Sequence, residues 1–429
     1  MKIPMIVLGA LLAPALAAAY PLDGYEETGI RRVEGSRLAN EGVIRDVKQP
    51  PGALLSTSQV DLRLLDRPEM DLPAPDPEFS RQIKALIGNE ASRYGIAVLD
   101  LSDLDHPRYG VWQENLRQNV GSVGKLVVGL GLFQALADIW PDDEQKRIEV
   151  LRDTMVIADR FSHWDHHTMR IFDPATNKLV RRPMKDGDRA SQWEYLDWML
   201  SVSANSAAAM NQRQGMLIRR YGKDFQPSEE EIHRFFRETP ASELTDLYQR
   251  TFWDPIPRSG LDIENLRQGS LFTREGKQQV KGGGNSYGTA RELMKYLLKM
   301  EQGKLVDEFS SRQLKRLLYM TERRIRYASS PALKDAAVYF KSGSLYKCSS
   351  KCKPYHGDVR NFMNSVAIVE SPAAERRLYY MVVIISNVLR KNSAVEHQSL
   401  GTRIQRLIEK AHPALATGVM KSAPAAKKE

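Results

Sequence analysis

The sequence predicts an α/β protein of the α+β kind, in which an antiparallel sheet with covering helices lies beside an all-helical lobe. Two observations predict this class. Segments rich in Val, Ile and Tyr, typical of strands, occur near residue 100 and again after residue 337. The region between them has mostly helical periodicity. Strands from both ends of the chain would therefore share one sheet, and the cleft beside the helical lobe would hold a small-molecule site.

Periodicity and capping residues place the expected elements along the chain. Residues 79–94 should form a helix, since Ile83, Leu86 and Ile87 recur on one face. Thr289 and Glu292 have the spacing of a capping box, which predicts a helix start. The other expected elements are strands at 95–101, 109–114, 338–346, 362–370 and 378–386, a helix from residue 122, and a final helix at 394–411.

The N-terminus has the pattern of a secretory signal. Lys2 precedes an almost wholly apolar run that ends in small residues, so residues 1–19 are expected to be a signal peptide. The alternative is an anchor that stays in the membrane, but Pro14 interrupts the run, which is short for a span of about 20 residues. We expect an exported protein, periplasmic in a Gram-negative source, with no stable membrane span after cleavage.

Proline-rich stretches divide the rest of the chain. They bound an N-terminal extension at 20–76, within which residues 59–65 alternate like a short strand. The main domain is expected at 77–412, and the Ala-, Pro- and Lys-rich residues 413–429 are expected to be a disordered tail. The sequence leaves open whether the extension packs on the main domain, and it leaves the oligomeric state open.

The chain is basic, with a formal charge of +9 and a pI of about 9.3. Such a field attracts anions, and the export signal argues against nucleic acid as the partner. Anionic cell-wall polymers, or small substrates bearing a carboxylate, fit the charge better. The alternative is a basic surface with no steering role.

Ser122 and Lys125 are the first candidate site residues. They stand where a polar stretch meets a long apolar run, so they should lie one turn apart at the start of a buried helix. A serine hydroxyl needs a neighbouring base to act as a nucleophile, and burial can lower the pKa of a lysine enough to supply one. The alternative is that Ser122 only caps the helix.

Two further motifs follow in the chain, Ser203-Ala-Asn205 and Lys341-Ser342-Gly343. The order Ser-x-x-Lys, Ser-x-Asn, Lys-Ser-Gly resembles the active-site serine family of class A β-lactamases and penicillin-binding proteins. The resemblance covers roughly residues 79–411. It implies the β-lactamase/transpeptidase-like fold, with the active site in the cleft between sheet and helical lobe, and no cofactor.

The resemblance also implies a role for each residue. Ser122 would attack an amide or ester carbonyl and Lys125 would accept its proton. Ser203 would relay a proton to the leaving nitrogen, and Asn205 would bind a substrate amide or Lys125. The Lys341-Ser342-Gly343-Ser344 stretch would bind substrate, with Lys341 holding a carboxylate and helping to keep Lys125 neutral. The backbone amides of Ser122 and Ser344 would stabilise the oxyanion.

The sequence departs from the family pattern in three ways. Ala204 stands where aspartate is usual, and an insertion occupies about residues 159–188. The Glu-x-x-Leu-Asn segment that activates the deacylating water in class A β-lactamases is missing; Glu264 and Glu275 lie in the right interval without that motif. Acylation should therefore be retained, whereas water attack on the acyl-enzyme should be slow.

Two smaller features remain. Cys348 and Cys352 could close a small disulfide loop at the rim of the cleft, or could be free thiols. The insertion contains His163-Trp-Asp-His-His167, for which a polar loop at the cleft mouth is favoured over a metal site, so no metal is expected.

Three functions stay open. The first is a secreted serine hydrolase that opens β-lactams through an acyl-enzyme at Ser122. The second is a D-alanyl peptidase or esterase acting on cell-wall peptides, which the missing glutamate favours. The third is a cell-wall binding protein that has lost turnover; the intact set Ser122, Lys125, Ser203, Asn205 and Lys341 argues against it.

Overall fold

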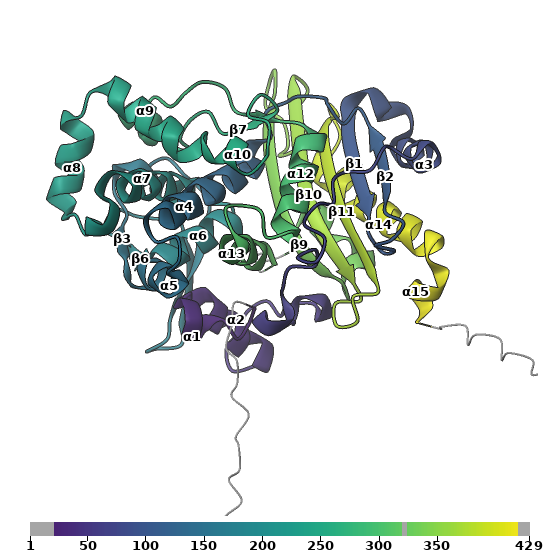
Figure 1. Ribbon diagram of the computed structural model, residues 1–429, viewed down its shortest axis with the longest axis horizontal. Coiled ribbons are helices and arrows are strands. Elements are labelled where there is room, and N and C mark those ends of the chain that lie inside the picture. Colours follow the sequence, from purple (N-terminus) through teal and green to yellow (C-terminus); the bar gives the residue numbers. More distant parts are fainter. Residues whose placement is uncertain (1–20, 320–323, 419–429) are drawn as a thin grey trace, which may run out of the picture.

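The computed structural model describes residues 21–319 and 324–418. The expected signal peptide at 1–19 lies outside these residues, as does most of the expected tail. The strands and helices meet as two bodies side by side, a sheet with its covering helices and a lobe made mainly of helices (Figure 1).

Strands from both ends of the chain form one five-stranded antiparallel sheet, in the order β2-β1-β11-β10-β9. The register places Val98 opposite Val382, and Val366 opposite Lys341 on the edge strand. The prediction of strands near both ends is confirmed. The strands are β1 Tyr94–Asp100, β2 Arg108–Trp112, β9 Ala337–Lys347, β10 Arg360–Ser371 and β11 Leu378–Asn387.

Alternate side chains of these strands enter two separate hydrophobic clusters, because successive residues of a strand face opposite sides. One face, with Val338 and Val382, packs on α3 (Pro77–Ile87) and α14 (Ser393–Ala411). The other face, with Tyr339 and Val383, packs on α12 (Ala290–Glu301) and α13 (Glu308–Tyr319), toward the helical lobe (Figure 1).

The centre of the helical lobe is α4 (Lys125–Ile139), whose residues are buried as far as Ala137. The helix with its preceding turn, Gly121–Ile139, is long and apolar enough to cross a membrane, yet 83% of it is buried inside the fold. It is therefore a core helix. The surrounding helices are α5 Glu144–Asp153, α6 Gln192–Leu200, α7 Asn205–Tyr221, α8 Glu229–Glu238, α9 Ala241–Phe252, α10 Pro255–Arg258 and α11 Arg274–Gln279.

The expected insertion is more ordered than the predicted polar loop. It carries a hairpin of β4 (Met169–Asp173) and β5 (Lys178–Arg182), which pairs Arg170 with Arg181. Two further short pairs lie in the lobe, β3 (Met155–Ile157) with β6 (Arg189–Ser191), and β7 (Leu266–Arg267) with β8 (Tyr287–Gly288).

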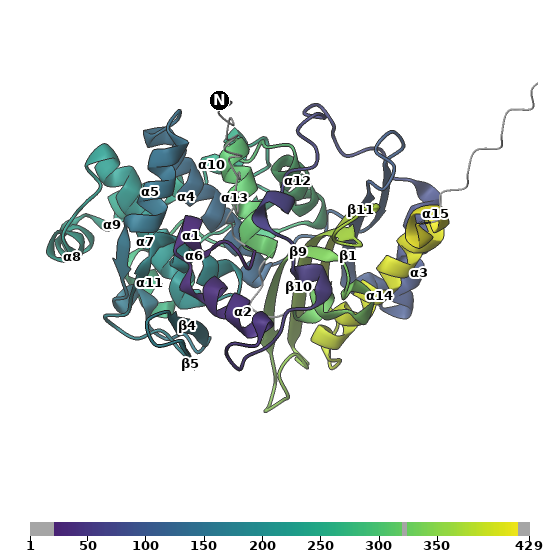
Figure 2. The same ribbon diagram turned by 90° about the horizontal axis from the view of Figure 1, so that it is seen from below.

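The extension packs on both bodies. Its helices α1 (Tyr25–Thr28) and α2 (Arg31–Glu41) lie on the helical lobe, and the chain then continues to the sheet (Figure 2). On the lobe, the buried Arg32 guanidinium pairs with Asp197 of α6 at 2.5 Å. On the sheet side, Gly52 N donates to Lys334 O at 2.9 Å, just before β9.

Two predictions about the segments that flank the main domain were wrong, one within the extension and one at the start of the tail. Residues 59–65 are not a strand: Val60, Leu62 and Leu64 are buried in alternation, but Leu64 N donates to Glu301 O of helix α12 instead of a neighbouring strand. The tail begins with a short helix, α15 (Pro413–Thr417), because proline at the first helical position suits a helix start. Residues 419–429 lie outside the described part.

Candidate active site

A pocket of about 610 Å³ lies between the edge strand β9 and the helical lobe. Five of the predicted site residues, from all three motifs, line it: Ser122, Ser203, Asn205, Ser342 and Ser344. Ser122 is half-buried on a 3-10 turn, Gly121–Gly124, that leads directly into α4. The three motifs, far apart in sequence, are therefore brought together on one pocket.

Lys125 is buried and reaches Ser122, with Nζ 3.0 Å from Ser122 Oγ. The same amine donates to Ser203 O at 2.6 Å and to Asn205 Oδ1 at 2.7 Å. A neutral amine has two N–H donors and one lone pair. When its two donors bond these carbonyl oxygens, the lone pair is left to accept the proton of the Ser122 hydroxyl.

The pKa of Lys125 is lowered to about 7, mainly by burial. The carboxylate of Asp165 opposes this shift, and the charge of Arg326 contributes to it. The sequence had given the role of the second cation to Lys341. In the structure Arg326 acts on Lys125, and the pKa of Lys341 is itself held well below its ordinary value by burial and by the charges of Lys125 and Arg326.

Ser203 lies between the two lysines. Its Oγ is 2.8 Å from Lys341 Nζ and 3.3 Å from Lys125 Nζ. The residue has a φ of 68°, a left-handed conformation that few non-glycine residues adopt, in the turn between α6 and α7. Because a hydroxyl can accept from both amines and still donate its own proton, Ser203 is suited to pass a proton onward.

Arg326, which the sequence did not single out, lines the same pocket. Its guanidinium donates to Ser342 Oγ at 2.6 Å and to Ser344 Oγ at 3.1 Å. Lys341, predicted to hold a substrate carboxylate, instead directs its buried amine at Ser203 and at Ser342 O. A substrate carboxylate would therefore meet Arg326 and the two serine hydroxyls beside it.

The backbone around Ser122 passes very close to β9. A Cβ on Gly343 would lie 2.1 Å from Val120 O and 2.6 Å from Ser122 N, so only glycine fits there. A Cβ on Gly121 would lie 3.1 Å from Ser344 N. The turn that carries Ser122 and the strand that carries Ser344 thus lie in close contact, and Gly343 permits this approach. That the amides of Ser122 and Ser344 stabilise the oxyanion stays a prediction.

The family is decided by comparison with known protein families. The model of the beta-lactamase enzyme family matches residues 78–408 of the sequence. The chain belongs to this family. Membership gives the fold as β-lactamase-like and the chain as a serine hydrolase of that type.

Comparison with solved structures finds only distant similarity to this β-lactamase-like chain. A structure described as PBP-A is 14% identical over 79% of this chain and 100% of its own, with a TM-score of 0.47. A beta-lactamase from Chitinophaga pinensis is 15% identical over 78% and 99%, with a TM-score of 0.49. A class A beta-lactamase representative from Bacteroides cellulosilyticus is 15% identical over 79% and 98%, with a TM-score of 0.48. No curated protein matches the sequence.

The place beside Lys125 holds an aromatic ring. The ring centroid of Phe272 lies 4.8 Å from Lys125 Nζ. Within the described residues, Lys125 bonds no carboxylate, and none of the residues lining the pocket is Asp or Glu. Glu264 is mostly exposed and pairs with Arg267, and Glu275 lies on α11. Neither lines the pocket, in keeping with the missing sequence motif.

The insertion forms another wall of the pocket through His166, His167, Thr168 and Arg181. Asp165 Oδ2 accepts from Ser206 N at 2.9 Å, and His167 Nδ1 lies 2.6 Å from Asp165 Oδ1. Asp165, His166 and His167 could offer a metal three ligand atoms within 4.8 Å of one another. Asp165 already bonds a backbone amide and an imidazole, and the absence of a metal here stays a prediction.

The predicted rim loop is present. Cys348 and Cys352 are joined to each other as a disulfide in the connection from β9 to β10. Tyr346 and Tyr355, which flank the loop in sequence, line the pocket.

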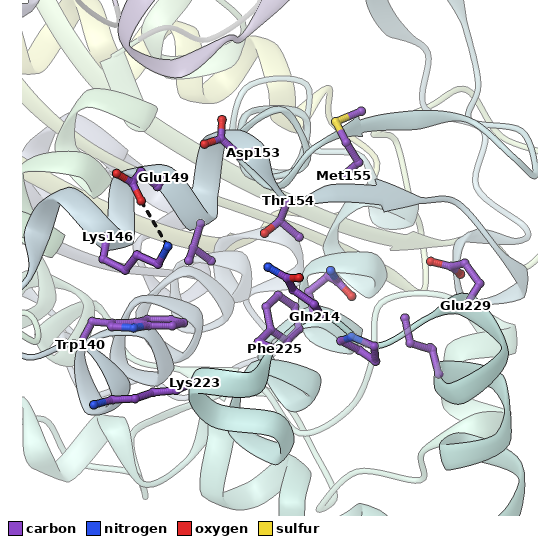
Figure 3. A pocket seen from close by; sticks show the side chains of 14 residues that line it. Trp140, Lys146, Glu149, Asp153, Thr154, Met155, Gln214, Lys223, Phe225 and Glu229 are labelled. Carbon is purple, nitrogen blue, oxygen red and sulfur yellow. Dashed lines mark hydrogen bonds and ion pairs between the residues drawn. The ribbon is translucent and has the colours of Figure 1, made fainter.

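A second pocket, of about 540 Å³, lies within the helical lobe near α5 and α8 (Figure 3). It contains an ion pair between Lys146 and Glu149 at 3.2 Å and the indole of Trp140 (Figure 3). No residue of the three sequence motifs lines this second pocket. The pocket at Ser122 is therefore the candidate active site.

Proposed function

We propose that this chain is an exported serine hydrolase that is acylated at Ser122 by the amide of a β-lactam and then hydrolysed slowly. The observation that carries the proposal is the buried amine of Lys125, 3.0 Å from Ser122 Oγ, with its two donors committed to Ser203 O and Asn205 Oδ1. A lysine held in this way is a base for the adjacent hydroxyl.

The steps follow from the positions of the groups. Ser122 Oγ attacks the lactam carbonyl as its proton passes to Lys125, and the oxyanion is stabilised by the amides of Ser122 and Ser344. The C–N bond then breaks, and Ser203 donates a proton to the leaving nitrogen. Lys125, which now carries the proton taken from Ser122 and lies 3.3 Å from Ser203 Oγ, replaces that proton.

Substrate position is set on both sides of the reacting bond. The carboxylate beside the leaving nitrogen would bind Arg326 with the hydroxyls of Ser342 and Ser344. The Nδ2 of Asn205 stays available to the substrate, since its Oδ1 accepts from Lys125. The acyl group would therefore extend along Asn205, away from β9.

A second candidate is a D-alanyl peptidase or esterase acting on cell-wall peptides. The observation that favours it is the Phe272 ring beside the amine of Lys125. None of the residues that line the adjacent pocket is a carboxylate. Without a placed base, water attacks the ester slowly, and an amine or hydroxyl of a second substrate could accept the acyl group instead. A binding protein without turnover is less well supported, since it would not need the buried Lys125.

Labelling with a fluorescent penicillin tests the proposal. The intact protein should gain one covalent label, measured by mass spectrometry, and Ser122→Ala should gain none. A label lost within seconds would favour an efficient β-lactamase, and one that persists for many minutes would favour the cell-wall enzyme. An unlabelled wild-type protein would contradict both and leave an unrelated ester substrate or the binding protein.

Export is the remaining part of the proposal, and it rests on the apolar run within residues 1–19. N-terminal sequencing of the mature protein from a bacterial periplasm should find a start near residues 18–20. A protein that keeps Met1 and stays in the membrane fraction would show a retained anchor instead.

A further inference from the structure

The insertion presents hydrogen-bond donors to the active-site pocket. His167 and Arg181, from the β4–β5 region, line it opposite the edge strand that carries Ser342 and Ser344. None of the described lining residues is Asp or Glu, although Asp46 pairs with Arg181 and Asp165 with His167. This wall can therefore attract a negatively charged part of the substrate.

Arg181 shares its carboxylate partner with a second arginine. Its Nη2 lies 2.8 Å from Asp46 Oδ1, and Arg170 on the paired strand lies 3.3 Å from Asp46 Oδ2. The side chain of Arg181 is 40% exposed, whereas Arg170 is fully buried. Arg181 is therefore the member of the pair that can reach a ligand.

His167 is held in one orientation. Its Nδ1 bonds Asp165 Oδ1, and the other oxygen of Asp165 accepts from both the amide and the hydroxyl of Ser206. The ring of His166 stacks on His167 with centroids 4.9 Å apart. Within the described residues Nε2 of His167 bonds no partner, and when the ring carries a proton on both nitrogens this atom can donate to an anion in the pocket.

The chain geometry decides which end of the substrate meets this wall. Ser206 directly follows Asn205, and Asp165 joins Ser206 to His167. The leaving group lies on the other side, toward Ser203, Lys341 and Arg326. A group on the acyl side of the reacting carbonyl would therefore run past Asn205 toward His167 and Arg181.

We propose that His167 and Arg181 form a second anion subsite, which binds a carboxylate or phosphate on the acyl side of the substrate. This inference rests on the proposed acylation of Ser122. It is separate from the carboxylate position at Arg326, and it predicts that the preferred substrate is acidic at both ends.

Two penicillins that differ by one carboxylate test the subsite. Benzylpenicillin and its α-carboxy analogue, carbenicillin, share the ring and the leaving group, and only the second has an acidic acyl side chain. The measured quantity is the ratio of their second-order acylation rate constants, taken at low salt so that charge effects are not screened. Wild-type protein should favour carbenicillin.

Arg181→Ala and His167→Ala should each lower this ratio about fivefold, as expected for a partly exposed charged contact. The acylation rate of each variant with benzylpenicillin is the reference, so that the ratio isolates the effect of the acyl-side carboxylate. The control is Arg182→Ala, since Arg182 is the neighbour on the same strand, pairs with Asp188 at 2.6 Å and does not line the pocket. Arg181→Lys, which keeps the charge, should restore most of the ratio.

The outcomes separate the two proposals. Acylation by both penicillins with a ratio unchanged in Arg181→Ala would overturn the subsite and leave the proposed function intact. An equal loss for both penicillins would also overturn it, since the wall would then be structural only. If wild-type protein is acylated by neither penicillin, the proposed function fails and the subsite fails with it.

Discussion

The ring of Phe272 covers the amine of Lys125, with its centroid 4.8 Å from Nζ. The ring helps to keep water from the amine, and burial is the largest cause of the lowered pKa of Lys125. It also occupies space beside the base without offering a group that could activate water. One side chain thus favours acylation and provides nothing for deacylation.

Placing a carboxylate at this position should speed the second step. Phe272→Glu is expected to shorten the lifetime of the penicilloyl-enzyme at least about tenfold, since a positioned general base contributes roughly that much or more. Phe272→Gln, with nearly the same shape and no charge, is the control. Release of the label, followed by mass spectrometry, measures the effect. Equal lifetimes in the two variants would argue that position 272 does not face the ester.

The pH dependence of acylation should report the ionisation of Lys125. The amine accepts a proton only when neutral, so the rate should rise with pH through about 7 and level off above it. Rapid labelling from pH 5 to 9 gives the midpoint. A rise only near pH 10 would mean that Lys125 keeps an ordinary pKa.

Two variants should move that midpoint in opposite directions. Arg326→Ala removes a cation that lowers the pKa of Lys125, so the midpoint should rise. Asp165→Asn removes a carboxylate that raises the same pKa, so the midpoint should fall. Shifts of the same sign in both variants would contradict the electrostatic account, whatever the changes in absolute rate.

The buried pair of Arg32 and Asp197 should be costly to break. Both side chains are almost fully buried, at 1% and 3% exposure. Arg32→Met leaves an unpaired carboxylate in the interior and should lower the free energy of unfolding by about 3–5 kcal/mol. Combining it with Asp197→Leu should recover most of the loss. Urea unfolding of the three proteins measures this, and equal losses in single and double variants would show that the charges do not matter.

His397 should make the protein sensitive to acid. Its ring is fully buried between the hydroxyls of Ser365 and Ser386, both at 2.9 Å, and burial lowers its pKa to about 3. Between pH 6.5 and that value the unfolded chain binds a proton that the folded chain excludes. The free energy of unfolding should therefore decrease by about 1.4 kcal/mol for each unit by which the pH is lowered in this range. His397→Asn should reduce this slope, as measured by unfolding at several pH values.

The sequence was sufficient for the residues whose roles are local. Ser122 and Lys125 are one turn apart, and the short motifs of Ser203, Asn205 and Lys341 carry recognisable chemistry, so their presence on one pocket could be predicted. The strand periodicity near both ends likewise predicted the shared sheet.

Residues that act through tertiary contacts gave no such signal. Arg326 belongs to no motif; its place depends on a backbone φ of 51° and on hydroxyls sixteen and eighteen residues away. Arg32 on α2 is polar in sequence, and only its pairing with Asp197 explains its burial. Residues 60–64 alternate as a strand would, but their outcome depended on α12, a distant helix that offered Glu301 O as a hydrogen-bond acceptor for Leu64 N.

The family match starts at residue 78, which suggests an obvious place to shorten the protein. The extension before it supplies the counterion of Asp197, and Arg31 of the same helix pairs with Glu194 on α6. It also supplies partners for Glu301 and Tyr319 near the sheet. A version trimmed to the family boundary would leave Asp197 and Glu194 of the helical lobe without these arginine partners. It would also expose the surface near the sheet that the extension covers. We therefore expect the smallest stably folded unit to begin well before residue 78.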